Sequence, residues 1–194
     1  MIPELNDLFA LFPDLRLTVA DKALCKKFHY GEPQLVSCSD NFEGEQEEEI
    51  LVLYEKDRPL GMVTTVIREN INKPAYPKNY ARLDLVIVDK KYRNIGVARL
   101  LIVCSLLKIM KNQGHQIYSI SCLAGHKTVA KFMKELHFQE HHQKEKNFWQ
   151  GILNLEENSL ESLIGLYREK AEKCLHWTGY QMERKNKIAQ HDSM

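Results

Sequence analysis

The sequence has little net charge and few cysteines, and both facts exclude classes of function. Its 27 Lys and Arg residues balance 26 Asp and Glu residues over 194 positions, so the formal net charge is +1. Bulk electrostatics therefore selects no partner, and we expect no nucleic-acid binding. The five cysteines are odd in number and widely spaced, which argues for reduced thiols in the cytoplasm rather than a disulfide framework or a zinc site.

Long apolar runs are also missing. The stretch 1–12 is broken by a proline and two acidic residues, so it does not resemble a secretory signal. The most apolar stretch follows Gly96, but Arg99 and Lys108 interrupt it, and it is too short to cross a bilayer. We therefore expect a cytoplasmic chain that makes no membrane contact.

Familiar phosphate and metal motifs are absent as well. No Gly-Lys-Ser/Thr triplet follows the one glycine-containing strand–helix loop, which excludes a Walker A loop. A dinucleotide-binding turn would need three glycines where the chain has only Gly96. His137, His141 and His142 have no Cys or carboxylate partner at ligand spacing, so no metal site is expected.

The most informative stretch that is present joins a strand to a helix through a basic loop. An apolar, β-branched run ends at Val88, the loop 89–95 follows, and Gly96 opens a long apolar helix. Free main-chain N–H groups and the positive end of the helix dipole meet at a helix start, so this order suits a phosphate. A glycine lets an anion approach the backbone, and Arg93 can add a charge-assisted hydrogen bond. An ordinary turn with a glycine for packing is the alternative.

The spacing Arg-x-x-Gly-x-Ala at Arg93, Gly96 and Ala98 resembles the pyrophosphate loop of the GNAT superfamily of acyl-CoA-dependent N-acyltransferases. The resemblance covers roughly residues 50–138 and, less clearly, 15–49. It implies that one strand holds the pantetheine and acyl carbonyl of acetyl-CoA and that the loop holds the pyrophosphate. The cofactor-binding residues implied in this way are Val86, Ile87, Val88, Arg93, Asn94, Ile95, Gly96, Val97, Ala98 and Arg99.

The order of the expected elements predicts an α/β fold with a mixed sheet. Strands at 50–54 and 60–67 form a hairpin, and a strand–helix–strand unit spans 81–88, 95–112 and 116–123. We expect a mostly antiparallel, GNAT-like sheet with helices on both faces, parallel and splayed at the CoA site.

The remaining segments predict mainly helices and loops. Helices are expected at 3–12, Asp21 to Gly31, 127–136 and 159–187, loops at 37–49 and 69–79, and a strand pair or a strand and loop at 139–149. No repeat or linker divides the chain. We predict a single GNAT-like domain over 1–194, with a core at about 15–150 and a C-terminal helical extension at about 158–188.

The reaction implied by the resemblance is attack of a free amine on the thioester of acetyl-CoA. The amine must first lose a proton, which calls for a general base. Asp84 is the first candidate, because it interrupts an apolar strand, and an ion pair with Arg82 is the alternative. Tyr80, Tyr118 and His126 are further candidates for moving protons, although most tyrosines serve packing and a loop histidine is more often a solvated surface residue.

One departure from the family leaves two functions open. The tyrosine that often protonates the leaving thiolate falls on Met133, whose thioether cannot donate a proton. The chain is either an N-acetyltransferase acting on a primary amine of an unknown small molecule or protein, or a catalytically impaired GNAT-like domain that binds CoA or a protein. Acyl transfer to a non-amine fits the loop, but no residue supports it.

Three other features each have a structural and a functional interpretation. The acidic run within 43–49 is either a solvated loop or an attractor for a cationic acceptor. Cys122 is expected to be a buried strand residue rather than an acyl-carrying nucleophile. The segment Trp177 to Tyr180 either packs on the core or meets a second copy of the chain in a homodimer.

Overall fold

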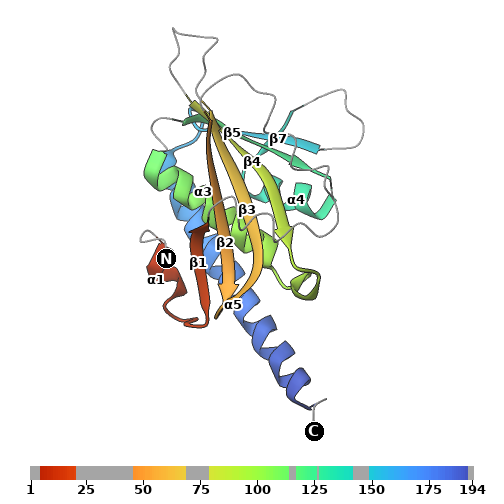
Figure 1. The fold of residues 1–194 in the computed structure, drawn as a ribbon. Helices are drawn as coiled ribbons and strands as arrows, with labels where there is room; N and C mark the ends of the chain where they lie inside the picture. Colours follow the sequence, from red (N-terminus) through yellow and green to blue (C-terminus); the bar gives the residue numbers. More distant parts are fainter. Residues whose placement is uncertain are drawn as a thin grey trace.

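The computed structural model describes residues 5–20, 46–68, 79–113, 117–125, 127–141 and 149–191. Its strands form one seven-stranded sheet in the order β1-β2-β3-β4-β5-β7-β6 (Figure 1). The strands are β1 (Leu15–Ala20), β2 (Gln46–Glu55), β3 (Arg58–Arg68), β4 (Asn79–Val88), β5 (Ile117–Ala124), β6 (Gln139–Glu140) and β7 (Trp149–Asn154). The helices are α1 (Asn6–Phe9), the 3-10 helix η4 (Lys90–Tyr92), α3 (Val97–Gln113), α4 (Lys127–Glu135) and α5 (Leu160–His191).

Neighbouring strands pair antiparallel throughout the sheet except for β4 and β5, which run parallel. The parallel pair arises because α3 connects the two strands as a crossover. The predicted mixed α/β sheet, mostly antiparallel and with a long C-terminal helix, is therefore confirmed.

The parallel pair β4–β5 diverges at the middle of β4. The last matched residues are Leu83 and Cys122, whereas β4 continues to Val88. The register between β3 and β4 skips Asp84, which marks a β-bulge. A bulge bends its strand and increases the local twist, so β4 turns away from β5 at this point (Figure 1). Every side chain from Asp84 to Val88 is only partly buried as a result.

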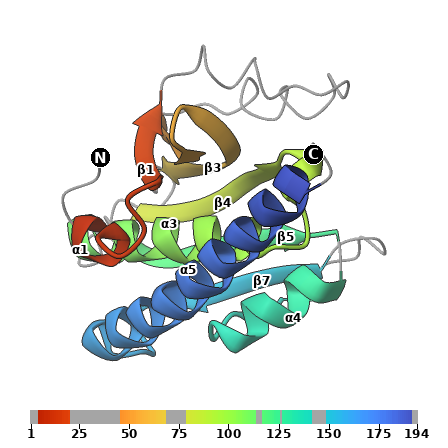
Figure 2. The same ribbon diagram turned by 90° about the horizontal axis from the view of Figure 1, so that it is seen from below.

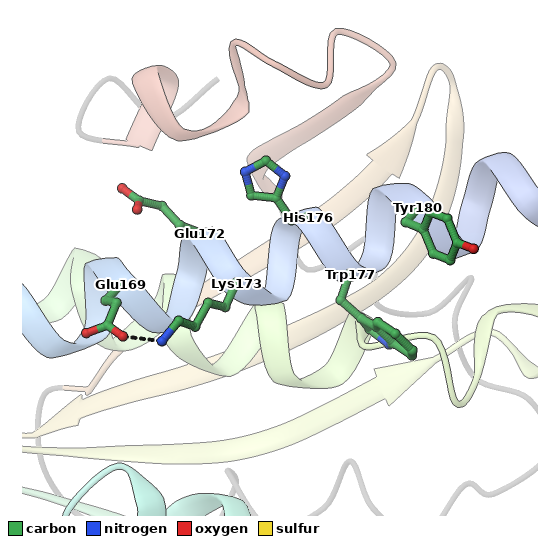
Figure 3. Close-up of a pocket in the computed structure, with 6 residues that line it drawn as sticks. All are labelled: Glu169, Glu172, Lys173, His176, Trp177 and Tyr180. Atoms are coloured by element: carbon green, nitrogen blue, oxygen red, sulfur yellow. Dashed lines mark hydrogen bonds and ion pairs between the residues drawn. The ribbon is translucent and has the colours of Figure 1, made fainter.

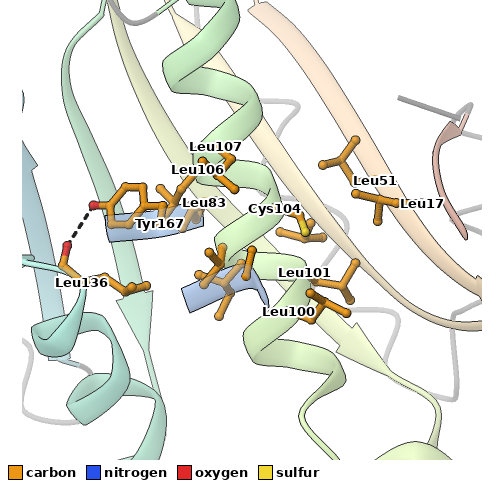
Figure 4. Packing of buried hydrophobic residues seen from close by; sticks show 14 of the residues in the cluster. Leu17, Leu51, Leu83, Leu100, Leu101, Cys104, Leu106, Leu107, Leu136 and Tyr167 are labelled. Carbon is orange, nitrogen blue, oxygen red and sulfur yellow. Dashed lines mark hydrogen bonds between the residues drawn. The ribbon is translucent and has the colours of Figure 1, made fainter. Parts of the chain in front are cut away.

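Helix α3 is apolar on nearly all sides, and other elements of the fold cover it on two opposite sides. One side packs on β2, β3 and β4, and the other packs on α5. Its leucines at 100, 101, 106 and 107 are at most 1% exposed (Figure 4). A helix that is hydrophobic all round has to be buried, so α5 completes a core that the sheet alone would leave open.

Helix α5 crosses the outer side of α3 and continues past it, with α4 lying beside it (Figure 2). Its inward-facing residues recur every four or so positions, as one face of a helix requires; they include Leu163, Tyr167, Ala171, Leu175 and Met182. The fully buried Tyr167 donates its hydroxyl to the carbonyl of Leu136, at 2.9 Å (Figure 4). An ion pair between Asp7 and Arg168 ties α1 to the same helix.

Two predicted boundaries at the N-terminal side are wrong. The first helix covers only Asn6–Phe9 instead of 3–12, because the chain turns through Phe12, which donates to the carbonyl of Phe9. Strand β2 begins at Gln46, inside the predicted loop 37–49. Its acidic residues pair with β3, and the carboxylate of Glu49 forms an ion pair with Lys108 of α3. Long-range pairing therefore outweighs the low strand propensity of glutamate.

Two strands were not predicted at all. They are β1, on the edge beside β2, and most of β7, which pairs with β5. The helix expected from Asp21 to Gly31 lies outside the described residues, as does the loop expected at 69–79 except for Asn79, which begins β4. None of the helices described here is both long enough and apolar enough to span a membrane.

Candidate functional site

The candidate site is built where β4 ends and α3 begins. The carboxylate of Asp89 caps η4 by accepting a hydrogen bond from the N–H of Lys91, at 2.8 Å. The chain then turns through Asn94 and Gly96, whose φ angles are 65° and 95°. Asparagine and glycine are the residues that adopt positive φ at least cost, so the local sequence specifies this loop.

The loop presents a row of main-chain donors. Within the described ranges, no oxygen accepts a hydrogen bond of ordinary geometry from the N–H groups of Asn94 through Arg99. The first bond into α3 runs from the N–H of Leu100 to the carbonyl of Gly96, at 3.0 Å. The first N–H groups of a helix lie at the positive end of its dipole. The start of this 17-residue helix is therefore suited to an anion.

Arg93 holds the loop against the strand. Its Nε donates to the carbonyl of Val88 at 3.1 Å, while the side chain stays exposed. A guanidinium has five N–H groups, so four remain for a ligand. Lys90, Lys91 and Arg99 are also exposed around the same loop, which concentrates positive charge there although the whole chain is nearly neutral.

Gly96 has a different neighbour from the predicted one. A Cβ at this position would lie 2.8 Å from Oγ1 of Thr178 and 2.9 Å from Cδ1 of Trp177, both on α5. The absent side chain therefore makes room for α5, whereas the sequence predicts that it lets an anion approach the backbone. The N–H of Gly96 is still one of the unbonded donors.

Helix α5 makes two further contacts that the sequence did not reveal, one with η4 before the loop and one with the end of β2. Lys185 donates from Nζ to the carbonyl of Lys91 in η4. One residue later, Asn186 donates from Nδ2 to Oε1 of Glu55, at the end of β2, at 3.1 Å. These contacts join residues more than 90 positions apart, and no local pattern signals them.

The divergence of β4 from β5 leaves one edge of β4 unpaired beyond Leu83. Val86, Ile87 and Val88 are partly buried along this edge. Across the gap, Leu123 of β5 is 57% exposed although it is apolar. An open strand edge can bind an extended ligand through main-chain hydrogen bonds, in the manner of an additional strand.

Of the three candidate proton-transfer residues that the structure describes, Asp84 alone lies at the divergence. Its Oδ1 is 2.5 Å from Nη2 of Arg82, and both side chains are 23% exposed. The ion pair named as the alternative is thus present. Tyr80 precedes Asp84 by four residues, roughly 13 Å along the strand, and Tyr118 lies beside it on β5. His126 is outside the described residues.

Two other side chains near the site are buried and chemically inert. Met133, at the position of the family tyrosine, is 1% exposed within the core. Burial raises the pKa of Cys122 to about 12, although a main-chain hydrogen bond from Gly151 opposes the shift. Such a thiol carries almost no thiolate at neutral pH. In the described part of the chain, no group of three His, Cys, Asp or Glu side chains could hold a metal ion.

Comparison with known proteins gives one family match. The model of the acetyltransferase (GNAT) family matches residues 18–138, which is more than half of the chain. That range includes β4, the loop and α3, and it ends before α5. No curated protein compared with the chain matches it.

Several solved structures share the fold at low sequence identity. AtaTR bound with AcCoA is 16% identical, with a TM-score of 0.54 over 78% of this chain and 99% of that one. A mutant AtaT toxin bound to the C-terminus of the antitoxin AtaR is 15% identical, with a TM-score of 0.53 over 77% and 98%. The KacTA–DNA complex is 16% identical, with a TM-score of 0.50 over 77% and 99%. The chain also spans 64% of PH1933 from Pyrococcus horikoshii OT3, at a TM-score of only 0.40.

Proposed function

The chain belongs to the GNAT family of acetyltransferases, and from this premise we propose that it transfers an acetyl group from acetyl-CoA to a primary amine. The observation that carries the proposal is the row of N–H groups from Asn94 through Arg99, which donate no hydrogen bond of ordinary geometry to the described main chain and lie next to the open edge of β4. A likeness of fold to AtaTR, which is bound with AcCoA, supports the same donor.

The proposed donor occupies the loop and the strand edge together. Its pyrophosphate accepts hydrogen bonds from the start of α3, and the exposed guanidinium of Arg93 adds charge. Its pantetheine lies along Val86 to Val88, where β4 has no neighbour. This direction brings the thioester toward the divergence of the two strands, and Asp84 lies there.

The reaction needs a neutral amine and a stabilised oxyanion. Keeping an alkylamine neutral at pH 7 costs roughly 4–5 kcal/mol, because its pKa is near 10.4. The amine nitrogen bonds to the acetyl carbon, the carbon–sulfur bond breaks, and the amine loses its proton to a base. We assign the base to Asp84, directly or through water, and the oxyanion to a main-chain N–H near Val88. Either water or the acceptor protonates the thiolate, since Met133 cannot.

Titration calorimetry with CoA and acetyl-CoA tests the donor, using two matched variants at opposite ends of α3. Arg93→Gln removes a charge at the loop, and we expect about tenfold weaker CoA binding. Lys111→Gln removes a positive charge roughly 20 Å away along α3 and should leave the affinity for CoA unchanged. If wild-type protein binds neither CoA nor acetyl-CoA, the proposal is wrong.

Release of CoA thiol during incubation with small amines, amino acids, aminoglycosides, polyamines and peptides tests the transfer. With an acceptor found, Asp84→Asn should lower kcat and leave KM for acetyl-CoA unchanged, because the carboxylate is remote from the loop. An equal kcat in Asp84→Asn would remove Asp84 as the base.

A second function is favoured by Met133, on which the family's proton-donating tyrosine falls when the resemblance is aligned at Phe138. In this alternative the chain binds CoA or a protein without turnover. CoA binding together with no thiol release for any amine would support it over acetyl transfer.

A further inference from the structure

Trp177 is a large aromatic side chain that borders the donor loop from outside the family match. It lies on α5, and the indole approaches the place of a Cβ on Gly96 to 2.9 Å at Cδ1 and 3.7 Å at Nε1. Even so, the residue is 53% exposed. One edge of the ring therefore abuts the loop while much of the ring faces solvent.

The same side chain lines an open hollow of about 510 Å³ on the outer side of α5 (Figure 3). Lys173 lies one turn before it and forms an ion pair with Glu169, and Tyr180 lies one turn after it (Figure 3). The lining is mostly apolar next to Trp177 and Tyr180, and charged toward the start of the helix. A flat aromatic ligand can therefore rest in this hollow against Trp177, the lining side chain that also reaches Gly96.

The covalent structure of coenzyme A determines which of its groups can lie next to Trp177. Only a ribose separates its adenine ring from the pyrophosphate, so adenine has to lie close to the N–H groups of α3. Every base has a flat π-face, and stacking on an aromatic side chain is a common way to bind one. Trp177 is the exposed aromatic side chain that touches Gly96. Its position fits a platform for the base at the outer end of the donor.

We propose that Trp177 stacks on the adenine ring of coenzyme A, so that α5 supplies the nucleotide-recognising wall of the donor site. This inference rests on the proposed function, because it needs the pyrophosphate at the start of α3. It assigns to α5 a role in donor binding in addition to its role in covering α3.

The test compares three ligands that share parts of the donor: CoA, adenosine 3′,5′-bisphosphate and 4′-phosphopantetheine. Trp177→Leu should weaken the first two by roughly 5- to 100-fold, the range expected for loss of one base stack. Binding of 4′-phosphopantetheine, which lacks adenine, should not change. Trp177→Phe keeps an aromatic ring and should fall between wild type and Trp177→Leu. Ile188→Ala, which shortens an equally exposed apolar side chain of α5 outside the hollow, is the matched control and should bind CoA like wild type.

The outcomes separate the two proposals. If wild-type protein does not bind CoA, both fail. If wild type binds CoA and Trp177→Leu binds it equally well, only the assignment of Trp177 is overturned. A Trp177→Leu protein that loses self-association in sedimentation velocity with unchanged CoA affinity would also overturn it, and would mark this face as a contact between copies. Urea midpoints of all variants check the fold, and Trp177→Phe retains most of the packing against Gly96.

Discussion

Replacing Gly96 by alanine separates two reasons for a glycine in the donor loop. If the glycine served only to let an anion approach, the ligand-free protein would tolerate the added methyl group. The structure predicts otherwise, because φ is 95° and a Cβ would lie 2.8 Å from Thr178 and 2.9 Å from Trp177. The ligand-free protein should therefore be destabilised even before any donor is added.

The expected magnitude follows from two contributions. A left-handed conformation costs a residue with a Cβ about 1–2 kcal/mol, and overpacking adds about 1–3 kcal/mol. We therefore expect Gly96→Ala to lose about 2–5 kcal/mol of unfolding free energy, which for this chain length lowers Tm by about 5–15 °C. Adding Thr178→Ala should restore only part of the packing contribution, because it removes the nearer of the two clashing atoms but leaves Trp177 and φ unchanged.

Urea unfolding without ligand measures this effect, with Gly165→Ala as the matched control. Gly165 is an exposed helical position on α5, and a Cβ there would meet no atom within 4 Å. That substitution should stabilise the protein by about 0.5–1 kcal/mol. A Gly96→Ala protein within about 0.5 kcal/mol of wild type, a typical effect for a neutral surface site, would refute the reasoning.

Three further substitutions or treatments test the packing around α5 and β5. Thr178→Val should stabilise the protein by about 1 kcal/mol in urea unfolding, because the buried Oγ1 has no hydrogen-bond partner in the described structure; a loss of stability would mean that the hydroxyl is satisfied. Tyr167→Phe should cost about 1–3 kcal/mol by leaving the carbonyl of Leu136 unpaired, and a neutral result would contradict the 2.9 Å bond. Burial raises the pKa of Cys122 to about 12, so the thiol should resist iodoacetamide at pH 8 until the protein unfolds. Peptide mapping measures the labelling, and labelling of Cys122 in the native protein would contradict this burial.

The elements that the sequence predicts correctly are those with strong local patterns. The β-branched run before Val88 and the apolar helix after Gly96 predict a parallel strand–helix–strand unit, and the structure contains it. The helical spacing of Leu163, Tyr167 and Ala171 predicts the long last helix, which is present. Periodicity is a reliable signal because each such pattern requires one buried face.

What the sequence does not predict depends on contacts between distant segments. The acidic start of β2 has low strand propensity, and it becomes a strand because β3 and Lys108 pair with it. The approach of α5 to Gly96 joins positions 82 residues apart in the chain. The roles of Asp84, Tyr80, Tyr118 and His126 remain predictions, since the geometry of a reacting acceptor decides them.

The contacts of α5 with Gly96, Lys91 and Glu55 tie the shape of the donor loop to the folding of the last helix. Ordering of the loop and docking of α5 are therefore thermodynamically linked. A ligand that binds only to the ordered loop also stabilises the docked helix, and undocking of the helix lowers the affinity for that ligand by the same factor. The C-terminal helix thereby becomes a place where a partner, a covalent modification or proteolysis could regulate the proposed donor site from a distance, without touching any atom of the ligand.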